Sequence, residues 1–498
     1  MDVRVFGYCA LSPEAIVRTP IDQLRGVDGN YVIALTMPTE TTLVSAAEGV
    51  WPHYYAVADG RFYHGPTVAD VLRQSRLPWE WNWRALADVA LNEHTIEDET
   101  LHPDVHRVPA DAVVKFQDGR LAIDRRSWDE IHPPGQATAG EAVDVLNDEV
   151  SRWADSSSIV AMSAGFDSRL LLSSLLHKGD RPRLLSMGFE ESTDVVIASR
   201  IARELDLPFT RIELAADDYI QHARRVAELT GGTKPAVHWH TFIAAHKAEI
   251  DPATRLFVGS NGEFCRSFLL DNGIASRIAG AVPGEMLLRK FWTLKFKPPF
   301  DENDLRAMPD EFAKRLRAEG RAEWADRRVA LCTGGFLPGL DKFYLTQRVR
   351  HFIGNGLILY SASCKPITPM TSLRWTSLIW NLGRRWKHGS AWHRFAIHRN
   401  NPGLMDFPEE GTSGRMPLRP RPLYWLHGKP KSVPYHKYDE WFRRGAMIDF
   451  IRGNAAILSD VIEPAQVQRI CDQQEATNAR QRAIAFFMSL IAWKQVIA

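Results

Sequence analysis

Several features that often reveal the class of a protein are scarce in this sequence of 498 residues. It has five cysteines, an odd number, and no Cys-x-x-Cys pair among them. They indicate a reduced, cytoplasmic protein and argue against a disulfide framework or a structural zinc site. The formal net charge is only +1, so we expect neither a nucleic acid nor an anionic membrane as the main partner.

Long hydrophobic runs are missing as well. The longest runs from Ala483 to Trp493, which is too short to cross a bilayer and predicts a buried helix. The first residues, Met-Asp-Val-Arg, lack the apolar core of a signal peptide, so we expect none. Hydrophobic residues make up 45% of the chain and charged residues 24%, a balance typical of folded globular proteins. The length indicates two or three domains.

The most informative stretch is residues 158–176. The apolar run from Ile159 to Met162 predicts a buried parallel strand, and the run from Leu170 to Leu176 predicts a helix. Between them stands Ser-Ala-Gly-Phe-Asp-Ser, residues 163–168. A strand, a tight loop of small residues and a helix in this order form an anion site, because loop amides and the helix N-terminus converge on one point.

Each polar position of this loop has a predicted role. Gly165 lets the backbone approach a ligand closely, and Ser163 and Ser168 supply hydroxyl donors. Asp167 would repel a bare phosphate, so its presence indicates a Mg²⁺ ion between carboxylate and phosphate. No Gly-Lys-Ser/Thr follows, which distinguishes the loop from the lysine-bearing P-loop.

Further strands and helices alternate after this loop. Residues 183–188, 209–214 and 256–258 read as strands, and residues 194–205 read as a helix. This alternation predicts an α/β fold with a doubly wound parallel sheet, in which ligands bind at the carboxyl ends of strands. Met187 and Gly188 end the second strand and are therefore placed to meet a ligand.

The first 130 residues read differently, as mainly β structure. Strand-like runs cover residues 31–35, 42–44, 54–57 and 112–116, and turn signals such as Asp59-Gly60 and Asp118-Gly119 separate them. The segment from Pro133 to Ala139 is the best linker, which predicts domains at 1–132 and 140–498, the second opening with a helix over 140–153.

Two other patterns have alternative interpretations. His238 and His240 form an H-x-H pair that could bind a metal, but no third ligand is apparent nearby, and pocket lining or core is favoured. Residues 306–328 are charged and helical and predict a solvated face.

The loop at 163–168 resembles the Ser-Gly-Gly-x-Asp-Ser signature of ATP pyrophosphatases, with Ala164 in place of one glycine. Residues 259–263, Gly-Ser-Asn-Gly-Glu, look like the second signature of the asparagine synthetase family, Gly-Glu-Gly-Ala/Ser-Asp-Glu. The order of the N-terminal segments is similar to that of the family's amidotransferase domain. Residues 344–350 and 366–370 also resemble family landmarks, and the resemblance covers almost the whole chain.

This resemblance implies a C-terminal domain of the ATP pyrophosphatase type, with ATP and Mg²⁺ as cofactors. Asp167 and Glu263 would hold the metal. The implied nucleotide-binding residues are Ala161, Ser163, Ala164, Gly165, Asp167, Ser168, Met187, Gly188, Val258 and Gly259. The family steadies pyrophosphate with a lysine, but the corresponding segment 410–415 has none, so Arg415 is the nearest cation and a candidate catalytic residue beside Asp167 and Glu263.

The N-terminal domain departs from the family at its nucleophile. The family's glutaminase needs a cysteine directly after the initiator Met, whereas this chain has Asp2, and Cys9 is displaced. We therefore expect a degenerate Ntn-type amidotransferase-like domain that serves as a docking or structural module.

The implied activity is an ATP-dependent, AMP-forming amide synthetase. Without a glutaminase, the amine would already be present on the substrate, as in lasso peptide macrolactam synthetases and β-lactam-forming synthetases. The shortened N-terminal domain is more like the lasso group, which implies a precursor peptide as substrate, a leader-peptide protease as partner, and a cavity enlarged by residues 273–340. The alternatives are β-lactam closure on a small β-amino acid, an asparagine-synthetase-like amidotransferase, an inactive scaffold and a tRNA-modifying enzyme.

Overall fold

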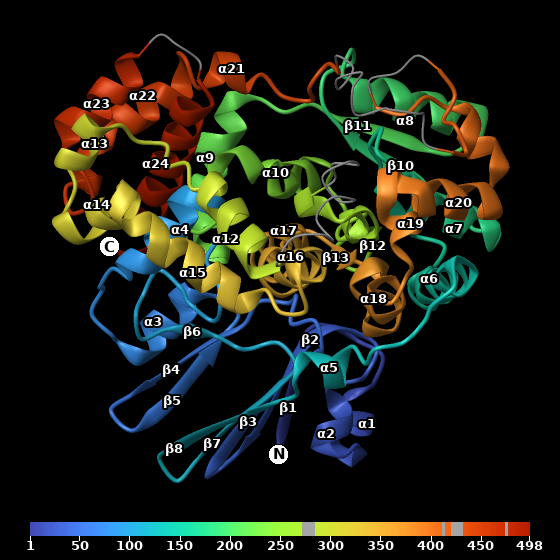
Figure 1. The fold of residues 1–498 in the computed structure, drawn as a ribbon, viewed down its shortest axis with the longest axis horizontal. Helices are drawn as coiled ribbons and strands as arrows, with labels where there is room; N and C mark the ends of the chain where they lie inside the picture. Colours follow the sequence, from blue (N-terminus) through green and yellow to red (C-terminus); the bar gives the residue numbers. More distant parts are fainter. Residues whose placement is uncertain (271–283, 411–413, 420–431, 474–476) are drawn as a thin grey trace.

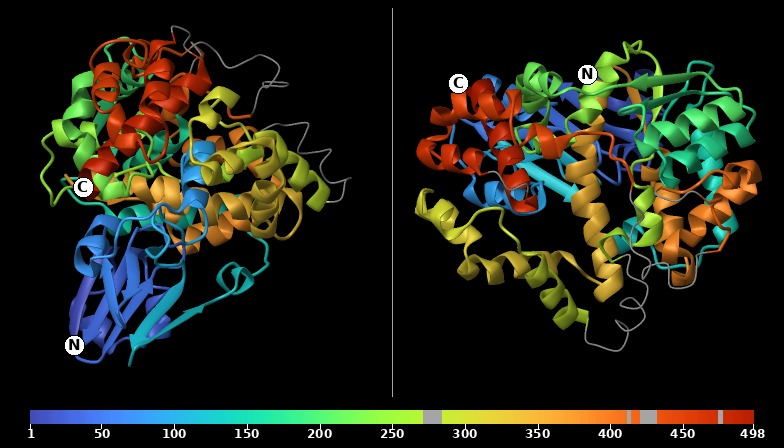
Figure 2. Two further views of the ribbon diagram at one scale, coloured as in Figure 1. Left: turned by 90° about the vertical axis from the view of Figure 1, so that its left-hand side faces the viewer. Right: turned by 90° about the horizontal axis from the view of Figure 1, so that it is seen from above.

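The computed structural model describes residues 1–270, 284–410, 414–419, 432–473 and 477–498. The protein is α/β, with an antiparallel sheet near the N-terminus and a parallel sheet among helices later in the chain. In Figure 1 the N-terminal strands extend below the rest of the molecule, and the C-terminal helices (red) cluster at its upper left; the left view of Figure 2 shows the same separation.

The N-terminal antiparallel sheet has the strand order β1-β2-β3-β7-β8. Its strands are β1 (Asp2–Cys9), β2 (Gly29–Met37), β3 (Glu40–Ser45), β7 (Ala112–Gln117) and β8 (Arg120–Arg125). A smaller sheet has the order β5-β4-β6 and consists of β4 (Tyr54–Ala58), β5 (Arg61–Gly65) and β6 (His106–Arg107). The predicted strands are confirmed.

Two of the predicted turns are also confirmed. Asp59 and Gly60 join β4 to β5 with φ values of 50° and 68°, and Asp118 and Gly119 join β7 to β8 with φ values of 50° and 75°. Positive φ at both central positions suits the twist of a hairpin, which explains the Asp-Gly pairs.

Helices of the N-terminal segment are α1 (Pro13–Arg18), α2 (Ile21–Leu24), α3 (Val68–Ser75), α4 (Trp83–Asn92) and α5 (Trp128–Ile131). The mainly-β interpretation did not include α3 and α4. Leu86 of α4 belongs to the same buried apolar cluster as Trp239 and Trp493 of the C-terminal part. The N-terminal segment therefore shares a core with the rest of the chain.

The linker prediction places the next helix well. Thr138 caps α6 (Ala139–Trp153), and its hydroxyl accepts the Glu141 N–H while the Glu141 carboxylate accepts the Thr138 N–H. This capping box fixes the helix start one residue before the predicted Gly140.

The parallel sheet has the order β11-β10-β9-β12-β13. Its strands are β9 (Ile159–Ala161), β10 (Arg183–Met187), β11 (Phe209–Ile212), β12 (Arg255–Phe257) and β13 (Lys365–Ile367). The chain runs outward from β9 to β11 and then returns to the other side of β9 as β12. Between β9 and β12 the order reverses, which makes the switch point where ligands bind in such sheets.

The strand β13 was not predicted as a strand. It holds Pro366, which cannot donate a ladder hydrogen bond, and the chain tolerates it because β13 lies at the edge of the sheet, beside β12.

The helices that follow cover and extend this sheet. Those up to β12 are α7 (Phe166–His177), α8 (Thr193–Glu204), α9 (Ala216–Thr230), η1 (Ala236–His238) and α10 (His240–Lys247). The next are η2 (Gly262–Arg266), η3 (Phe268–Leu270), α12 (Gly284–Lys295), α13 (Glu302–Arg306), α14 (Asp310–Leu316), η5 (Ala318–Gly320), α15 (Arg321–Leu331) and α16 (Phe336–Phe343). Then come the π-helical η6 (Tyr344–Ile353) and α17 (Gly354–Ser361).

The remaining helices form the C-terminal part. After β13 they are η7 (Pro369–Thr371), α18 (Leu373–Trp380), α19 (Arg384–Lys387), η8 (His388–Ser390), α20 (Ala391–Asn400) and η9 (Pro402–Asp406). The last are α21 (Tyr438–Trp441), α22 (Ala446–Gly453), η11 (Ala455–Leu458), α23 (Pro464–Asp472) and α24 (Asn478–Ile497).

Two expectations for the later part of the chain can be compared with the structure. The apolar run 483–493 is buried within α24, as expected. The charged stretch 306–328 is mostly helical and exposes charged side chains, but its helices also have an inner side on which Phe312 and Trp324 are buried, so it is a solvated face only in part. Within the described ranges, each helix falls short of the length and apolarity needed to cross a membrane.

Candidate active site

A pocket of about 390 Å³ lies at the carboxyl ends of β9, β10 and β12. It is therefore at the switch point of the parallel sheet. Eight of the predicted site residues line it, namely Ala161, Ser163, Asp167, Ser168, Met187, Val258, Gly259 and Glu263. Segments about 100 residues apart in the sequence thus meet around one cavity.

The loop 163–168 between β9 and α7 is fixed by local hydrogen bonds among its own residues. The N–H groups of Ser163 and Gly165 donate to the hydroxyls of Ser168 (3.1 Å) and Ser163 (3.2 Å). The two hydroxyls lie 3.1 Å apart. The Ala164 N–H donates instead to the Asp194 carboxylate at the start of α8, at 2.8 Å. The small residues of the loop therefore allow a tight turn, and its hydroxyls lie beside the pocket.

A buried arginine anchors the back of the loop. The Arg169 guanidinium donates to the carbonyls of Ala164 (3.3 Å), Phe407 (3.2 Å) and Pro408 (2.7 Å). Burial lowers the pKa of Arg169 to about 10. Because the cation is satisfied by carbonyl oxygens on two segments, it ties the loop to the chain after η9.

Asp167 stands at the first turn of α7 and is held on two sides. The Nε2 atom of His393, a fully buried residue of α20, lies 2.8 Å from the Asp167 Oδ1 atom. An added Cβ at Gly262 would lie 2.7 Å from the Asp167 Cβ, and one at Gly259 would lie 2.9 Å from the Asp167 carbonyl carbon. Only glycine permits such an approach at these two positions, so the second predicted segment packs directly against the first.

Glu263 follows these glycines and reaches the same pocket. The Tyr344 hydroxyl, at the start of η6, donates to the Glu263 Oε2 atom at 3.0 Å. Burial and the nearby Asp167 carboxylate raise the pKa of Glu263. The two acidic side chains are therefore close enough to repel each other.

This pair suits one kind of metal site. In the part of the chain that the structure describes, no group of three or more His, Cys, Asp and Glu side chains is arranged to hold a metal. A Mg²⁺ ion does not need such a cage, because it is usually held by one or two carboxylates together with substrate phosphates and water. Asp167 and Glu263 fit this pattern.

Four predicted residues are not among the side chains that line the pocket. Ala164 is a buried residue of the loop, and Gly165 is the N-cap of α7. Gly188 has a φ of 134°, and a Cβ there would lie 2.9 Å from the Tyr435 Cβ, so this glycine makes room for Tyr435, which does line the pocket.

Arg415, the fourth, lies at the surface. Its side chain is 79% exposed and forms an ion pair with Asp406 at 3.1 Å. The structure thus does not bring it to the pocket. Residues 411–413 of the same predicted segment lie outside the described residues.

Several lining residues were not predicted as site residues. Asp194 and Lys234 both line the pocket, as do His238 and His240, the latter two in agreement with the pocket-lining interpretation. Burial lowers the pKa of both histidines, that of His240 to about 3, so both are neutral near pH 7.

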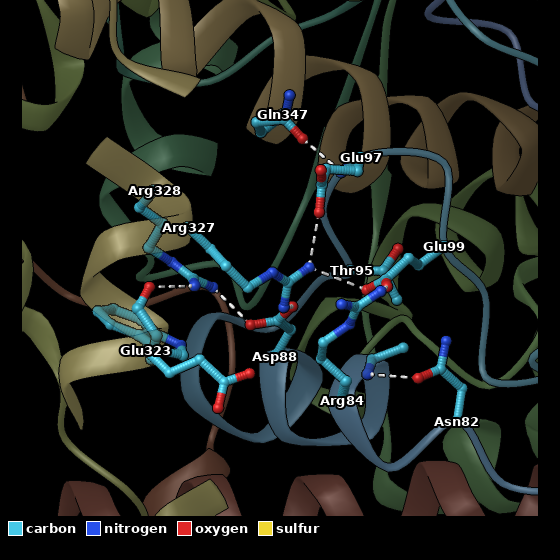
Figure 3. A network of polar contacts seen from close by, with 12 residues as sticks. Asn82, Arg84, Asp88, Thr95, Glu97, Glu99, Glu323, Arg327, Arg328 and Gln347 are labelled. Atoms are coloured by element: carbon cyan, nitrogen blue, oxygen red, sulfur yellow. Dashed lines mark hydrogen bonds and ion pairs between the residues drawn. The ribbon is translucent and has the colours of Figure 1, made fainter. Parts of the chain in front are cut away.

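The N-terminal segment supports this site from outside. The Glu97 N–H donates to the Gln347 Oε1 atom of η6 at 2.7 Å, and the Arg350 guanidinium donates to the Glu97 carbonyl at 2.6 Å. Figure 3 shows Glu97 also paired with Arg327 of α15, at 2.7 Å. Since η6 carries Tyr344, these contacts fix the helix that positions Glu263.

The same network buries an ion pair between the N-terminal and C-terminal parts. Asp88 of α4 pairs with Arg328 at 2.6 Å and with Arg327 at 3.1 Å, and Asp88 and Arg328 are almost fully buried (Figure 3). The N-terminal segment is therefore firmly docked.

The expected absence of a glutaminase nucleophile stays a prediction. Asp2 is exposed on β1 and pairs with Arg4 at 2.9 Å. Cys9 is partly buried at the other end of β1, and burial raises the pKa of its thiol, which disfavours the reactive thiolate.

No family model matches this chain, and no curated protein matches it.

Proposed function

We propose that this protein is an ATP-dependent, AMP-forming amide synthetase similar to asparagine synthetases. The observation that carries the proposal is that the loop 163–168 packs against the segment 259–263 at the switch point. Gly259 and Gly262 leave the space that Asp167 occupies, and Asp167 and Glu263 line the same pocket. The N–H groups of Ser163, Ala164 and Gly165 are engaged within the protein, so the loop offers the pocket the hydroxyls of Ser163 and Ser168. Two hydroxyls beside a pair of carboxylates suit a nucleoside triphosphate with Mg²⁺.

The strand order supports a finer proposal about the fold. We assign the C-terminal part to the ATP pyrophosphatase type, on the basis of the order β11-β10-β9-β12-β13 with the loop after β9. We assign the N-terminal part to a degenerate Ntn-type domain, on the basis of its two antiparallel sheets.

The proposed reaction has two steps. A substrate carboxylate oxygen attacks the α-phosphorus of ATP, and the bond to the β-phosphate oxygen breaks with loss of pyrophosphate. An amine then attacks the acyl carbon of the mixed anhydride, AMP leaves, and the amine loses a proton. Bound Mg²⁺ would neutralise phosphate charge. The chain's own residues would position the reacting groups: Ser163 and Ser168 would donate their hydroxyls to the phosphates, and Asp167 and Glu263 would hold the metal.

We further propose that the amine belongs to the substrate itself, because Asp2 and Cys9 provide no glutaminase nucleophile. The proposed substrate is a precursor peptide whose Asp or Glu side chain is joined to its N-terminal amine, as in lasso peptides. A protease that removes a leader segment is then the expected partner. Of the segment 273–340 that was expected to enlarge the cavity, residues 273–283 lie outside the described residues, and residues 284–340 contribute no side chain to the described pocket, so they give this choice no support.

Nucleotide binding is the first test. Mg·ATP binding to the wild type, measured by calorimetry, should be weakened at least about tenfold by Asp167→Asn, which is nearly isosteric but loses the anionic metal ligand. Asp144→Asn is the matched control, because Asp144 lies exposed on α6 in an ion pair with Arg399. Failure of the wild type to bind Mg·ATP would refute the proposal.

The substrate is the second test. The purified enzyme with ATP, Mg²⁺ and a precursor peptide encoded nearby should yield a product lighter by one water, together with AMP and pyrophosphate. Formation of AMP with a small β-amino acid, and none with the peptide, would favour β-lactam closure instead.

A further inference from the structure

A buried lysine lines the pocket and was not part of any motif. Lys234 is 4% exposed, its Nζ atom donates to the Phe352 carbonyl of η6 at 2.8 Å, and it lies 3.5 Å from the centre of the Phe352 ring. An ammonium has three N–H donors, so the bond to the Phe352 carbonyl leaves two of them for other acceptors.

The chain around Lys234 is built to hold it there. Gly231 and Gly232 both have positive φ, and a Cβ on Gly232 would lie 2.7 Å from the Trp493 Cβ of α24. The Trp239 Nε1 atom donates to the Lys234 carbonyl at 2.8 Å, and the Ser489 hydroxyl donates to it at 3.2 Å. Two glycines and two donors thus fix the backbone beside the pocket.

Lys234 lacks the partner that a buried lysine normally has. Among the described residues, no carboxylate lies within ion-pair distance of its Nζ atom, and the nearby Glu93 carboxylate is engaged by His238 at 3.1 Å. Burial, and then the charge of Arg348, lower the pKa of Lys234 to about 7, although Glu93 opposes the shift. Burying a cation in this way is costly, and a bound anion would offset the cost.

The side chains that line the pocket are rich in carboxylates and poor in cations, so an anionic ligand there requires compensating positive charge. Three carboxylates line it, those of Asp167, Asp194 and Glu263. Lys234 is the one lysine or arginine side chain among the described lining residues, and Arg415 lies at the surface. A triphosphate in this pocket therefore has Lys234 as its protein cation.

We infer that Lys234 binds the phosphate oxygens of the nucleotide. The inference rests on the proposed function, because it assumes that the pocket takes ATP. It places the phosphate-binding cation between α9 and α10 instead of in the segment around Arg415. The Phe352 carbonyl and ring hold the ammonium in the absence of nucleotide, and phosphate oxygens take its remaining donors when nucleotide binds.

The test compares phosphate-bearing and neutral ligands by calorimetry. Lys234→Met should weaken binding of Mg·ATP and of pyrophosphate at least about tenfold, and leave the affinity for adenosine within about twofold of the wild type. Lys342→Met is the control, since Lys342 also lies over an aromatic ring, that of Trp128, but does not line the pocket. Lys234→Gln keeps a polar side chain and replaces Lys234→Met if the latter unfolds.

The outcomes separate the two proposals. A wild type that binds neither Mg·ATP nor pyrophosphate contradicts the proposed function. A wild type that binds both, with Lys234→Met binding them equally well, refutes the role of Lys234 alone. An equal loss for adenosine would also refute it, because that result indicates a collapsed pocket.

A second measurement uses the wild type without mutation. At about pH 8 the Lys234 side chain is mostly a neutral amine. If it becomes an ammonium to bind phosphate, Mg·ATP binding should take up close to one proton, which appears as a dependence of the binding heat on the ionisation enthalpy of the buffer. Glu93, His238, His240 and the fixed charge of Arg348 lie near Lys234, and the carboxyl groups of Asp167, Asp194 and Glu263 line the same pocket. Comparison with Lys234→Met isolates the lysine, and an uptake unchanged by that substitution would contradict the inference.

Discussion

A single methyl group at Gly262 provides a sharp test of the candidate site. The Cβ of Gly262→Ala would lie 2.7 Å from the Asp167 Cβ and closer still to its carboxylate, whereas ordinary contact begins at 3.4 Å. His393 holds the Asp167 carboxylate at 2.8 Å and Gly259 packs against its backbone, so the side chain can move only into the pocket. Either the segment 259–263 moves away or the Asp167 side chain leaves its position.

The size of the effect follows from this crowding. Overpacking of this kind costs about 1–3 kcal/mol. If the displaced carboxylate carries that cost into nucleotide binding, the Kd of Mg·ATP should rise by about 5- to 150-fold. The affinity for adenosine should change much less, because the neutral nucleoside does not need the metal.

The assay is calorimetric titration with Mg·ATP and adenosine, with circular dichroism to confirm that the variant is folded. Gly453→Ala serves as the control, because a Cβ at the end of α22 meets no atom within 4 Å. If Gly262→Ala bound Mg·ATP as tightly as the wild type, Asp167 would not be the metal-binding carboxylate of this pocket.

Three further predictions follow from other parts of the molecule. Asp88→Ala should lower the free energy of unfolding by about 3–5 kcal/mol in denaturant titrations, because it leaves Arg327 and the buried Arg328 without their shared carboxylate; a loss below about 1 kcal/mol would contradict the docking role of the network. Incubation with glutamine should release no glutamate above background, since Asp2 replaces the nucleophile; glutamine-dependent amide formation would overturn the interpretation of the N-terminal part. Lys234→Met should stabilise the ligand-free protein, most strongly at and below about pH 7. The folded-state pKa of about 7 is below the unfolded value of about 10.4, so the penalty of up to roughly 5 kcal/mol fades as the pH rises between them, and thermal unfolding at several pH values would measure it.

The sequence predicted the elements whose signals are contiguous. The strand β9, the loop 163–168 and α7 follow one another within 20 residues, and each has its own pattern: an apolar run, small and hydroxyl residues, and a second apolar run. The Asp-Gly turns were equally clear, because only a few residues accept positive φ at both positions. In contrast, β13 is a three-residue edge strand containing a proline, and no periodicity can develop over that length.

The residues that were missed share another physical property: their role depends on burial that the local sequence does not determine. Lys234 follows Thr-Gly-Gly-Thr and reads as a turn residue, and a lysine in a turn is normally exposed. Its burial comes from α24, more than 250 residues later, whose Trp493 closes against Gly232. Asp194 likewise lines the pocket, and Tyr344 contacts the pocket residue Glu263, through helices packed by distant segments. Because the N-terminal Glu97 bonds to Gln347 and Arg350 of the helix that carries Tyr344, the N-terminal part contributes to the shape of the candidate site.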